Sequence, residues 1–193
     1  AHPMNLSDIR FPRQLEADGT AETIRKALMA RTVKLWPGGD LDVARITMDD
    51  PLKKALRMAR LQGRIQYGFE TVSDRLADES KGIENVRRRG GGPYGDRVSR
   101  LLLFSNDGAE RFYRHVESLL QAHAPRLFGC LLDIDGIALG SAVTGKEAHI
   151  KLLMAEHKDA VSEILRTMVA GRNIDPSAND TIKKAAVKPW PMD

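Results

Sequence analysis

The feature that most constrains the fold is a series of three apolar runs that begins near the middle of the chain. The runs cover residues 99–105, 127–134 and 137–143. Runs of this length and composition are typical of buried strands, and the intervening segment 108–124 carries apolar residues at helical spacing. We expect strand, helix, strand and strand, followed by a helix that ends near Val169. The sequence therefore predicts a βαββα unit over 97–170.

The segment 148–154 fits two structures. Ile150, Leu152 and Met154 alternate as they would in a strand, whereas Ile150, Met154, His157 and Val161 keep the spacing of a helix. We expect a strand as far as Met154 and a helix after it. The unit is then βαββ(β)α.

The first 86 residues are predicted to be mainly helical. Asp49-Asp50-Pro51 is a strong helix start, because acidic side chains favour the positive end of the helix dipole and proline fits the first turn. A small hairpin is expected from 33–36 and 41–48 around a Pro-Gly-Gly turn. Together with the unit over 97–170, this predicts the α/β (α+β) fold class.

A run of three glycines, residues 90–92, followed by Pro93 marks the clearest boundary in the chain. We divide the chain into a mainly helical region over 1–86, an Arg/Gly-rich linker over 87–96, the α/β unit over 97–170 and a C-terminal tail over 171–193. In the tail we expect a short helix over 180–187, and we expect Trp190 to pack against the body.

Composition restricts the location of the protein. No run of about 18 uncharged apolar residues is present, so we expect no membrane-spanning segment. The N-terminus has neither the basic start nor the apolar stretch of an intact signal peptide. The single cysteine, Cys130, lies in an apolar run and is expected to be a buried core residue. These features favour the cytoplasm.

Positive charge is concentrated in one window. The chain carries a net charge of +4, and residues 87–114 alone hold seven arginines against three acidic residues. Guanidinium groups on a glycine-rich segment can follow a phosphate backbone, and Tyr94 can stack on a base. The predicted polyanion site consists of Arg87, Arg88, Arg89, Tyr94, Arg97 and Arg100. The alternative is a solvated linker whose arginines pair with acidic residues such as Asp74, Asp78 and Glu79.

The sequence Leu131-Leu-Asp133-Ile-Asp135-Gly136 resembles the first motif of the haloacid-dehalogenase-like phosphatases. The resemblance implies that Asp133 is a nucleophile and Asp135 a general acid, with Mg²⁺ between them. Ile137 departs from that family's pattern, in which a threonine is usual. Asp-Gly between two apolar runs is also the pattern of a tight β-hairpin, and we favour the hairpin.

A second motif, Gly140-Ser-Ala-Val-Thr-Gly145-Lys146-Glu147, resembles the phosphate-binding loop of the P-loop NTPases in its first seven positions. In that family the eighth position holds a hydroxyl that binds magnesium, and here it is Glu147. We interpret the segment as a turn with two glycines.

A magnesium site is the alternative functional hypothesis. A helical crossover makes the strands over 99–105 and 127–134 parallel, so their carboxyl ends lie at the same edge of the sheet, where ligands usually bind. Asp107, Asp133 and Asp135 follow these strands and can share a Mg²⁺ ion. The hypothesis is Mg²⁺-dependent binding or hydrolysis of a phosphate ligand.

The leading hypothesis is a binding or regulatory protein that contacts RNA or DNA through the arginine-rich segment, with no cofactor or with Mg²⁺. A third hypothesis is a homo-oligomeric assembly subunit. Its helix would pair through the apolar stripe from Ile65 to Val86, and a break is expected near Gly63 and Gly68. Whether the protein is an enzyme stays open.

Overall fold

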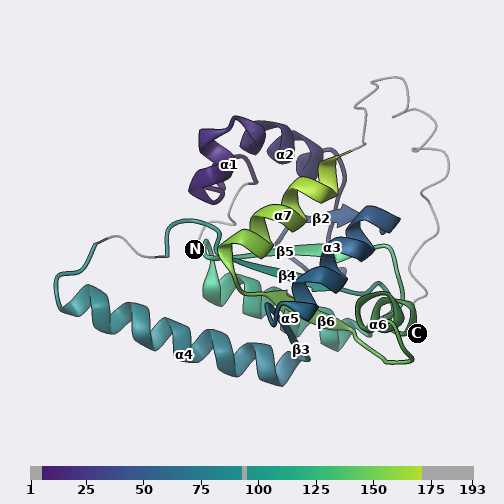
Figure 1. Ribbon diagram of the computed structural model, residues 1–193. Coiled ribbons are helices and arrows are strands. Elements are labelled where there is room, and N and C mark those ends of the chain that lie inside the picture. The colour runs from purple at the N-terminus through teal and green to yellow at the C-terminus, as the bar shows by residue number, and fades with distance from the viewer. Residues whose placement is uncertain (1–5, 93–94, 171–193) are drawn as a thin grey trace.

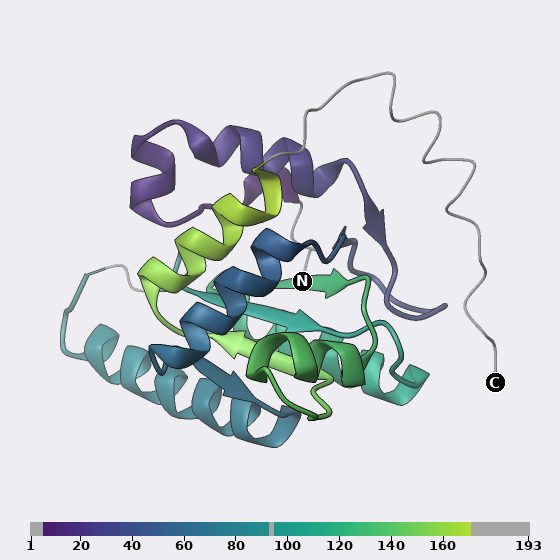
Figure 2. The ribbon, with the colours of Figure 1, turned by 45° about the vertical axis from the view of Figure 1, so that its right-hand side comes forward.

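The computed structural model describes residues 6–92 and 95–170. In these ranges a six-stranded sheet lies between two layers of helices (Figures 1 and 2). The predictions for Tyr94, for the helix over 180–187 and for Trp190 fall outside the described residues. Within them, no helix has both the length and the apolar character needed to cross a lipid bilayer.

The elements follow in chain order. They are η1 (Leu6–Asp8), α1 (Arg13–Ala17), α2 (Thr20–Met29), β1 (Thr32–Val33), β2 (Val43–Ile46), α3 (Asp50–Leu61), β3 (Ile65–Tyr67), α4 (Phe69–Arg88), β4 (Arg100–Phe104), α5 (Glu110–His123), β5 (Leu127–Leu132), α6 (Gly136–Thr144), β6 (Leu152–Ala155) and α7 (Lys158–Val169).

The sheet is mixed, with the strand order β1-β2-β5-β4-β6-β3. Strands β2, β5 and β4 are parallel, while β1, β6 and β3 each run antiparallel to their neighbours. Phe104 of β4 lies opposite Leu131 of β5, which confirms the predicted parallel pair. Strands from both sides of 87–96 join this one sheet. The mixed α/β class with helices in the N-terminal region is therefore confirmed.

The central strands are buried on both faces, which explains why they read as continuous apolar runs. In β4, Leu101 and Leu103 face the core beneath α2, α3, α6 and α7, whereas Leu102 and Phe104 face the core beneath α4 and α5. All four side chains are fully buried. Each contributes roughly 1.5–3 kcal/mol through removal from water.

Several local predictions are confirmed. Strands β1 and β2 form the expected antiparallel pair. Helix α3 begins where expected, and the Asp49 carboxylate accepts a hydrogen bond from Leu52 N at 2.9 Å as its N-cap. The break near Gly63 and Gly68 is also present, because β3 lies between α3 and α4.

The hairpin expected at Asp135-Gly136 is wrong, because residues 137–143 belong to helix α6. Asp135 Oδ1 accepts a hydrogen bond from Ala138 N at 2.7 Å, so this aspartate is an N-cap. Leu139 and Val143, four residues apart, are buried, and Gly145 ends the helix with a φ of +74°. The segment that resembles a P-loop is therefore the end of this helix and its C-cap. The strand-then-helix order expected after it is confirmed, although β6 starts only at Leu152.

Helix α4 is only partly covered by the rest of the molecule. Val72 and Leu76 in its first half are fully buried against the sheet, whereas Val86 near its end is 40% exposed. The helix continues past the body of the molecule, as Figure 1 shows. The uncovered end of α4 forms one wall of a groove.

Candidate functional site: an arginine-lined groove

The carboxyl-terminal edge of the parallel strands gathers the three predicted metal ligands, and two of them have structural partners of their own. Asp133 forms ion pairs with Arg31, at 3.1 Å between Nη1 and Oδ2, and with the Arg45 guanidinium. Asp135 caps α6. Two arginines therefore already neutralise the carboxylate that follows β5.

Asp107, which follows β4, is held in the same way. Its Oδ1 accepts hydrogen bonds from Ser105 Oγ at 2.7 Å and from Gly136 N at 3.1 Å. Burial by itself raises the pKa of Asp107, but these hydrogen bonds and the Lys151 charge outweigh burial and hold that pKa below its usual value. The carboxylate is thus ionised and occupies the anion position at the start of α6.

The loop after β4 is closed by Tyr113. Its hydroxyl donates to Ser105 O at 2.8 Å and accepts from Gly108 N at 3.0 Å. Burial, together with the charge of Asp107, raises the pKa of Tyr113 to about 12, so the phenol keeps its proton. Across residues 6–92 and 95–170, no group of three or more His, Cys, Asp or Glu side chains is arranged to hold a metal ion.

The opposite edge of the sheet carries a groove of about 740 Å³. It lies between the N-terminal arm (residues 9–13), the projecting end of α4 and the segment that leads into β4 (residues 95–99). Five arginines line the groove, while Glu79 and Asp96 are the acidic residues in its lining, so the lining carries a net charge of +3. The arginines are Arg10, Arg13, Arg97, Arg100 and Arg126.

The outer arginines of the groove, Arg10 and Arg97, point outward because they alternate with buried apolar residues. Ile9 and Phe11 are buried, so Arg10 between them is directed outward. Val98 is buried next to Arg97 in the same way, and Val98 N donates to Arg10 O at 2.8 Å. Two short segments thus lie side by side, each anchored by apolar side chains and each presenting arginines to the groove.

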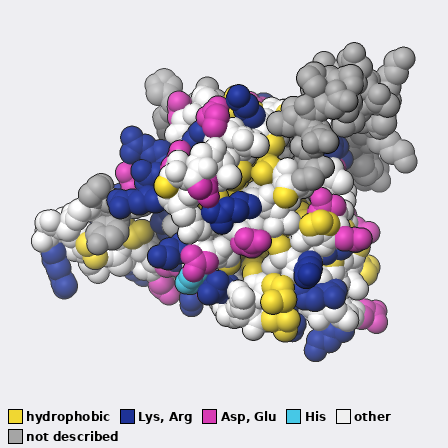
Figure 3. All heavy atoms as spheres, turned by 45° about the horizontal axis from the view of Figure 1, so that its top comes forward, with side chains coloured by type: hydrophobic (Ala, Val, Ile, Leu, Met, Phe, Trp, Pro, Cys, Tyr) yellow, Lys and Arg dark blue, Asp and Glu magenta, His cyan; other side chains and the backbone are white. Residues whose placement is uncertain are grey.

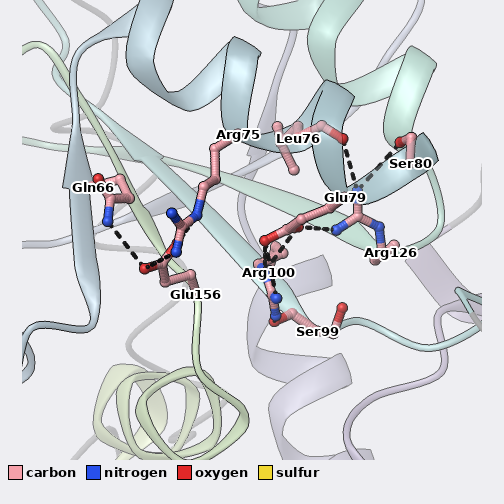
Figure 4. A network of polar contacts seen from close by, with 9 residues as sticks. All are labelled: Gln66, Arg75, Leu76, Glu79, Ser80, Ser99, Arg100, Arg126 and Glu156. Atoms are coloured by element: carbon pink, nitrogen blue, oxygen red, sulfur yellow. Dashed lines mark hydrogen bonds and ion pairs between the residues drawn. The ribbon is translucent and has the colours of Figure 1, made fainter. Parts of the chain in front are cut away.

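Glu79 of α4 organises the inner arginines (Figure 4). It accepts hydrogen bonds from Arg100 Nε and Nη2, each at 3.1 Å, and forms an ion pair with Arg126 Nη1. Arg126 is only 7% exposed, so its charge depends on this partner. Two guanidinium groups share one carboxylate, and the cluster keeps one net positive charge.

A second cluster on α4 lies beside the first (Figure 4). Arg75, one helical turn before Glu79, donates to both carboxylate oxygens of Glu156 at 2.9 and 3.0 Å. Gln66 of β3 donates to the same carboxylate at 3.0 Å. These contacts attach α4 to the sheet as far as its middle, and the helix then leaves the body.

The projecting end of α4 supplies an apolar roof, formed by Ile83 and Val86. Gly91 N donates to Val86 O at 2.9 Å, and a Cβ at Gly91 would collide with the Val86 side chain. Gly95, at a φ of +88°, lies close enough to Ile83 that its Cβ would come within 3.9 Å of Cδ1. Gly91 and Gly95 therefore lie beside the roof without side chains that would fill the groove.

The apolar stripe proposed as an oligomer contact is divided among three parts of the structure. Ile65 lies in β3, and Val72 and Leu76 belong to the core. Only Ile83 and Val86 at its end face the groove.

The predicted polyanion residues divide into two groups. Arg97 and Arg100 line the groove. Arg87, Arg88 and Arg89 lie at the end of α4, where Arg88 Nε pairs with Glu84 at 3.3 Å. Glu79, one of the acids proposed as a neutralising partner, pairs with Arg100 and Arg126.

The remaining arginines of the basic window, Arg111 and Arg114, lie on α5, whose first residues are at the carboxyl-terminal edge. Arg114 stacks over the Trp36 ring at 4.6 Å. The window 87–114 is therefore divided between two edges of the sheet.

Sequence reasoning missed Arg10, Arg13 and Arg126. The alternation of Ile9, Arg10 and Phe11 was a usable signal for the arm. Arg126 directly precedes β5, so the predicted parallel pairing with 99–105 already implied that it lies beside Arg100.

Basic side chains gather where the projecting end of α4 meets the body (Figure 3). Such a groove can attract anions and bind them through guanidinium forks. No family model matches this chain, and no curated protein matches it at a significant level. The two motif resemblances therefore assign no family.

Proposed function

We propose that this protein binds a phosphate-rich polyanion, a nucleic-acid backbone, in the arginine-lined groove. One observation carries the proposal. Five arginines from three separate parts of the chain converge on one concave surface that contains two acidic residues.

The chemistry of the lining supports phosphate as the bound group. Every basic side chain in the lining is an arginine, whose planar fork matches two phosphate oxygens and is more weakly hydrated than an ammonium group. Arg13 is exposed, and Arg10 is paired with Asp96 at 3.5 Å in an exposed ion pair. Such pairs contribute about 0–1 kcal/mol, so a phosphate can replace Asp96 at little cost.

The inner cluster of Glu79, Arg100 and Arg126 contributes to anion binding through its electrostatic field. Glu79 holds Arg100 and Arg126 in place, and their excess positive charge lies at the inner end of the groove. Within a Debye length of about 8–10 Å this charge adds to the attraction of the outer arginines.

The test is the double variant Arg10→Ala/Arg13→Ala. We expect its affinity for a fluorescent single-stranded oligonucleotide, followed by anisotropy between about 50 and 200 mM salt, to fall roughly tenfold or more at the low-salt end. The slope of log K against log salt should become shallower by about 1.4, because two phosphate contacts are lost and each contributes about 0.7.

The matched control is Lys54→Ala/Arg111→Ala. Both residues are exposed, neither lines the groove, and the change in net charge is the same. The control should keep near-native affinity. Equal losses in both variants, or no binding of any polyanion at about 50 mM salt, would remove the proposal.

A further inference from the structure

We infer that the groove takes a single-stranded nucleic acid, with phosphates on the arginine floor and bases against the apolar roof of Ile83 and Val86. This inference rests on the proposed function and adds to it the class of nucleic acid and the part of the ligand that each wall contacts.

The two walls differ in chemistry. Arg10, Arg13 and Arg97 come from the arm and the segment before β4, whereas Ile83 and Val86 come from α4. Val86 is 40% exposed although it lies within a groove, so a ligand can still cover it. A ligand that satisfies both walls must carry negative charge on one side and a flat apolar surface on the other. A nucleotide strand has these two sides.

A duplex does not satisfy both walls. Its phosphates lie on the outside of a stiff rod and its bases are stacked inside, so a duplex would reach the arginines at the rim without offering a base face to Ile83. In a single strand each base can turn away from its phosphate and lie against an apolar or aromatic side chain.

An acidic peptide fits less well. Amphipathic helices are read through three or four apolar anchors at helical spacing, and the roof offers two aliphatic side chains. The volume of about 740 Å³ suits a few nucleotides, because it lies within the range of about 300–1,000 Å³ that is usual for small ligands.

Gly91 and Gly95 lie next to the roof and place no side chain over it. Side chains at Gly91 or Gly95 would press against Val86 or approach Ile83 and Arg87. With glycine at both positions the apolar surface beside the arginines stays accessible.

The experiment compares three probes with the intact protein. They are an oligothymidylate of about 16 nucleotides, a hairpin duplex of the same total length, and inorganic polyphosphate, which has no bases. We expect the oligothymidylate to bind at least about tenfold more tightly than the duplex.

The variant Ile83→Ser/Val86→Ser should weaken oligothymidylate binding roughly tenfold, which corresponds to about 1.4 kcal/mol. Its affinity for polyphosphate and the salt slope should change by less than about twofold, since the phosphate contacts stay. Normal polyphosphate binding also shows that the variant is folded.

The control is Met58→Ser/Leu61→Ser, a more exposed apolar pair on α3, which should bind all probes as the native protein does. Equal binding of duplex and single strand, equal loss of both probes in Ile83→Ser/Val86→Ser, or equally tight binding of a polyglutamate peptide would overturn the inference while leaving a polyanion site intact. Failure of every polyanion to bind would instead overturn the proposed function.

Discussion

The two edges of the central sheet differ in how their charged side chains are paired. At the carboxyl-terminal edge, acidic side chains cap helices or pair with arginines: Asp49 caps α3, Asp135 caps α6 and Asp133 binds Arg31 and Arg45. At the amino-terminal edge, five arginines share a groove with two acids.

If the groove binds the ligand, the topology of the sheet does not by itself locate the site. In open α/β sheets ligands usually bind at the carboxyl ends of the strands, partly because helix N-termini there attract anions. Here the carboxylate of Asp107 accepts a hydrogen bond from Gly136 N at the start of α6 and takes the place of an external anion. The lining of the groove at the other edge holds five arginines against two acidic residues.

The largest effect is expected for Glu79→Gln, which removes the acid that holds the inner arginines. Arg126 is left buried without its counter-charge, so we expect the free energy of unfolding to fall by about 2–3 kcal/mol in urea titrations. Oligonucleotide affinity should rise at the same time, because two guanidinium groups lose their internal partner.

Glu84→Gln is the matched control, since Glu84 makes an exposed pair with Arg88 one turn further along α4. Its cost should be below about 0.5 kcal/mol. If Glu79→Gln lowers both stability and oligonucleotide affinity, the inner cluster is part of the fold without contributing to the anion field.

A smaller effect is expected when Arg87, Arg88 and Arg89 at the end of α4 are replaced by alanine. These residues extend the positive surface beyond the groove, so nucleic-acid retention should weaken by about tenfold at low salt and its salt dependence should flatten. Melting temperature should be almost unchanged, because the helix end is exposed. Unaltered retention would confine the binding surface to the groove itself.

His123, at the amino-terminal edge, is expected to make the stability of the fold depend on pH. Burial lowers its pKa, the nearby Arg126 lowers it further, and Glu79 partly opposes both; its Nδ1 lies 3.2 Å from Ser80 Oγ. The unfolded chain therefore binds a proton first, and stability should decrease as pH falls below about 6.5 until the lowered pKa is passed. Melting curves of His123→Gln should show a weaker decline over that range. An identical decline would assign the acid sensitivity to other groups.

The smallest effect is expected for magnesium at the carboxyl-terminal edge. Because Asp133 and Asp135 already have protein partners and Asp107 accepts two hydrogen bonds, millimolar Mg²⁺ with or without nucleotides should shift the melting temperature by less than about 1 °C. A rise of several degrees that disappears in Asp107→Asn would restore the metal hypothesis and weaken the contrast between the edges.

Much of the fold could be predicted from sequence because the strongest signals are local. The apolar runs identified β4 and β5, and Asp49 with Pro51 marked the start of α3. Asp135-Gly136 misled because an aspartate before glycine serves a hairpin and a helix N-cap equally well. Leu139 and Val143, with Gly145 after them, carried the helical signal, but the run of apolar residues concealed it.

The candidate site was only half predictable. Arg97 and Arg100 were named because they lie in a basic window that is visible along the chain. Arg10 and Arg126 join them through the buried anchors Ile9 and Phe11 and through strand pairing, and these signals lie outside the basic window from which the site was predicted. Arg111 and Arg114 belong to the same basic window of the sequence, but the fold places them on α5, away from the groove.

The most direct test of the account is a map of amide and arginine side-chain NMR shifts as single-stranded oligonucleotide is added to labelled protein. We predict changes at Arg10, Arg13 and Arg97 and along 82–92 and 95–100, with residues 105–108 and 133–138 unaffected. Changes centred on 105–108 and 133–138, or no changes at a saturating oligonucleotide concentration, would contradict it.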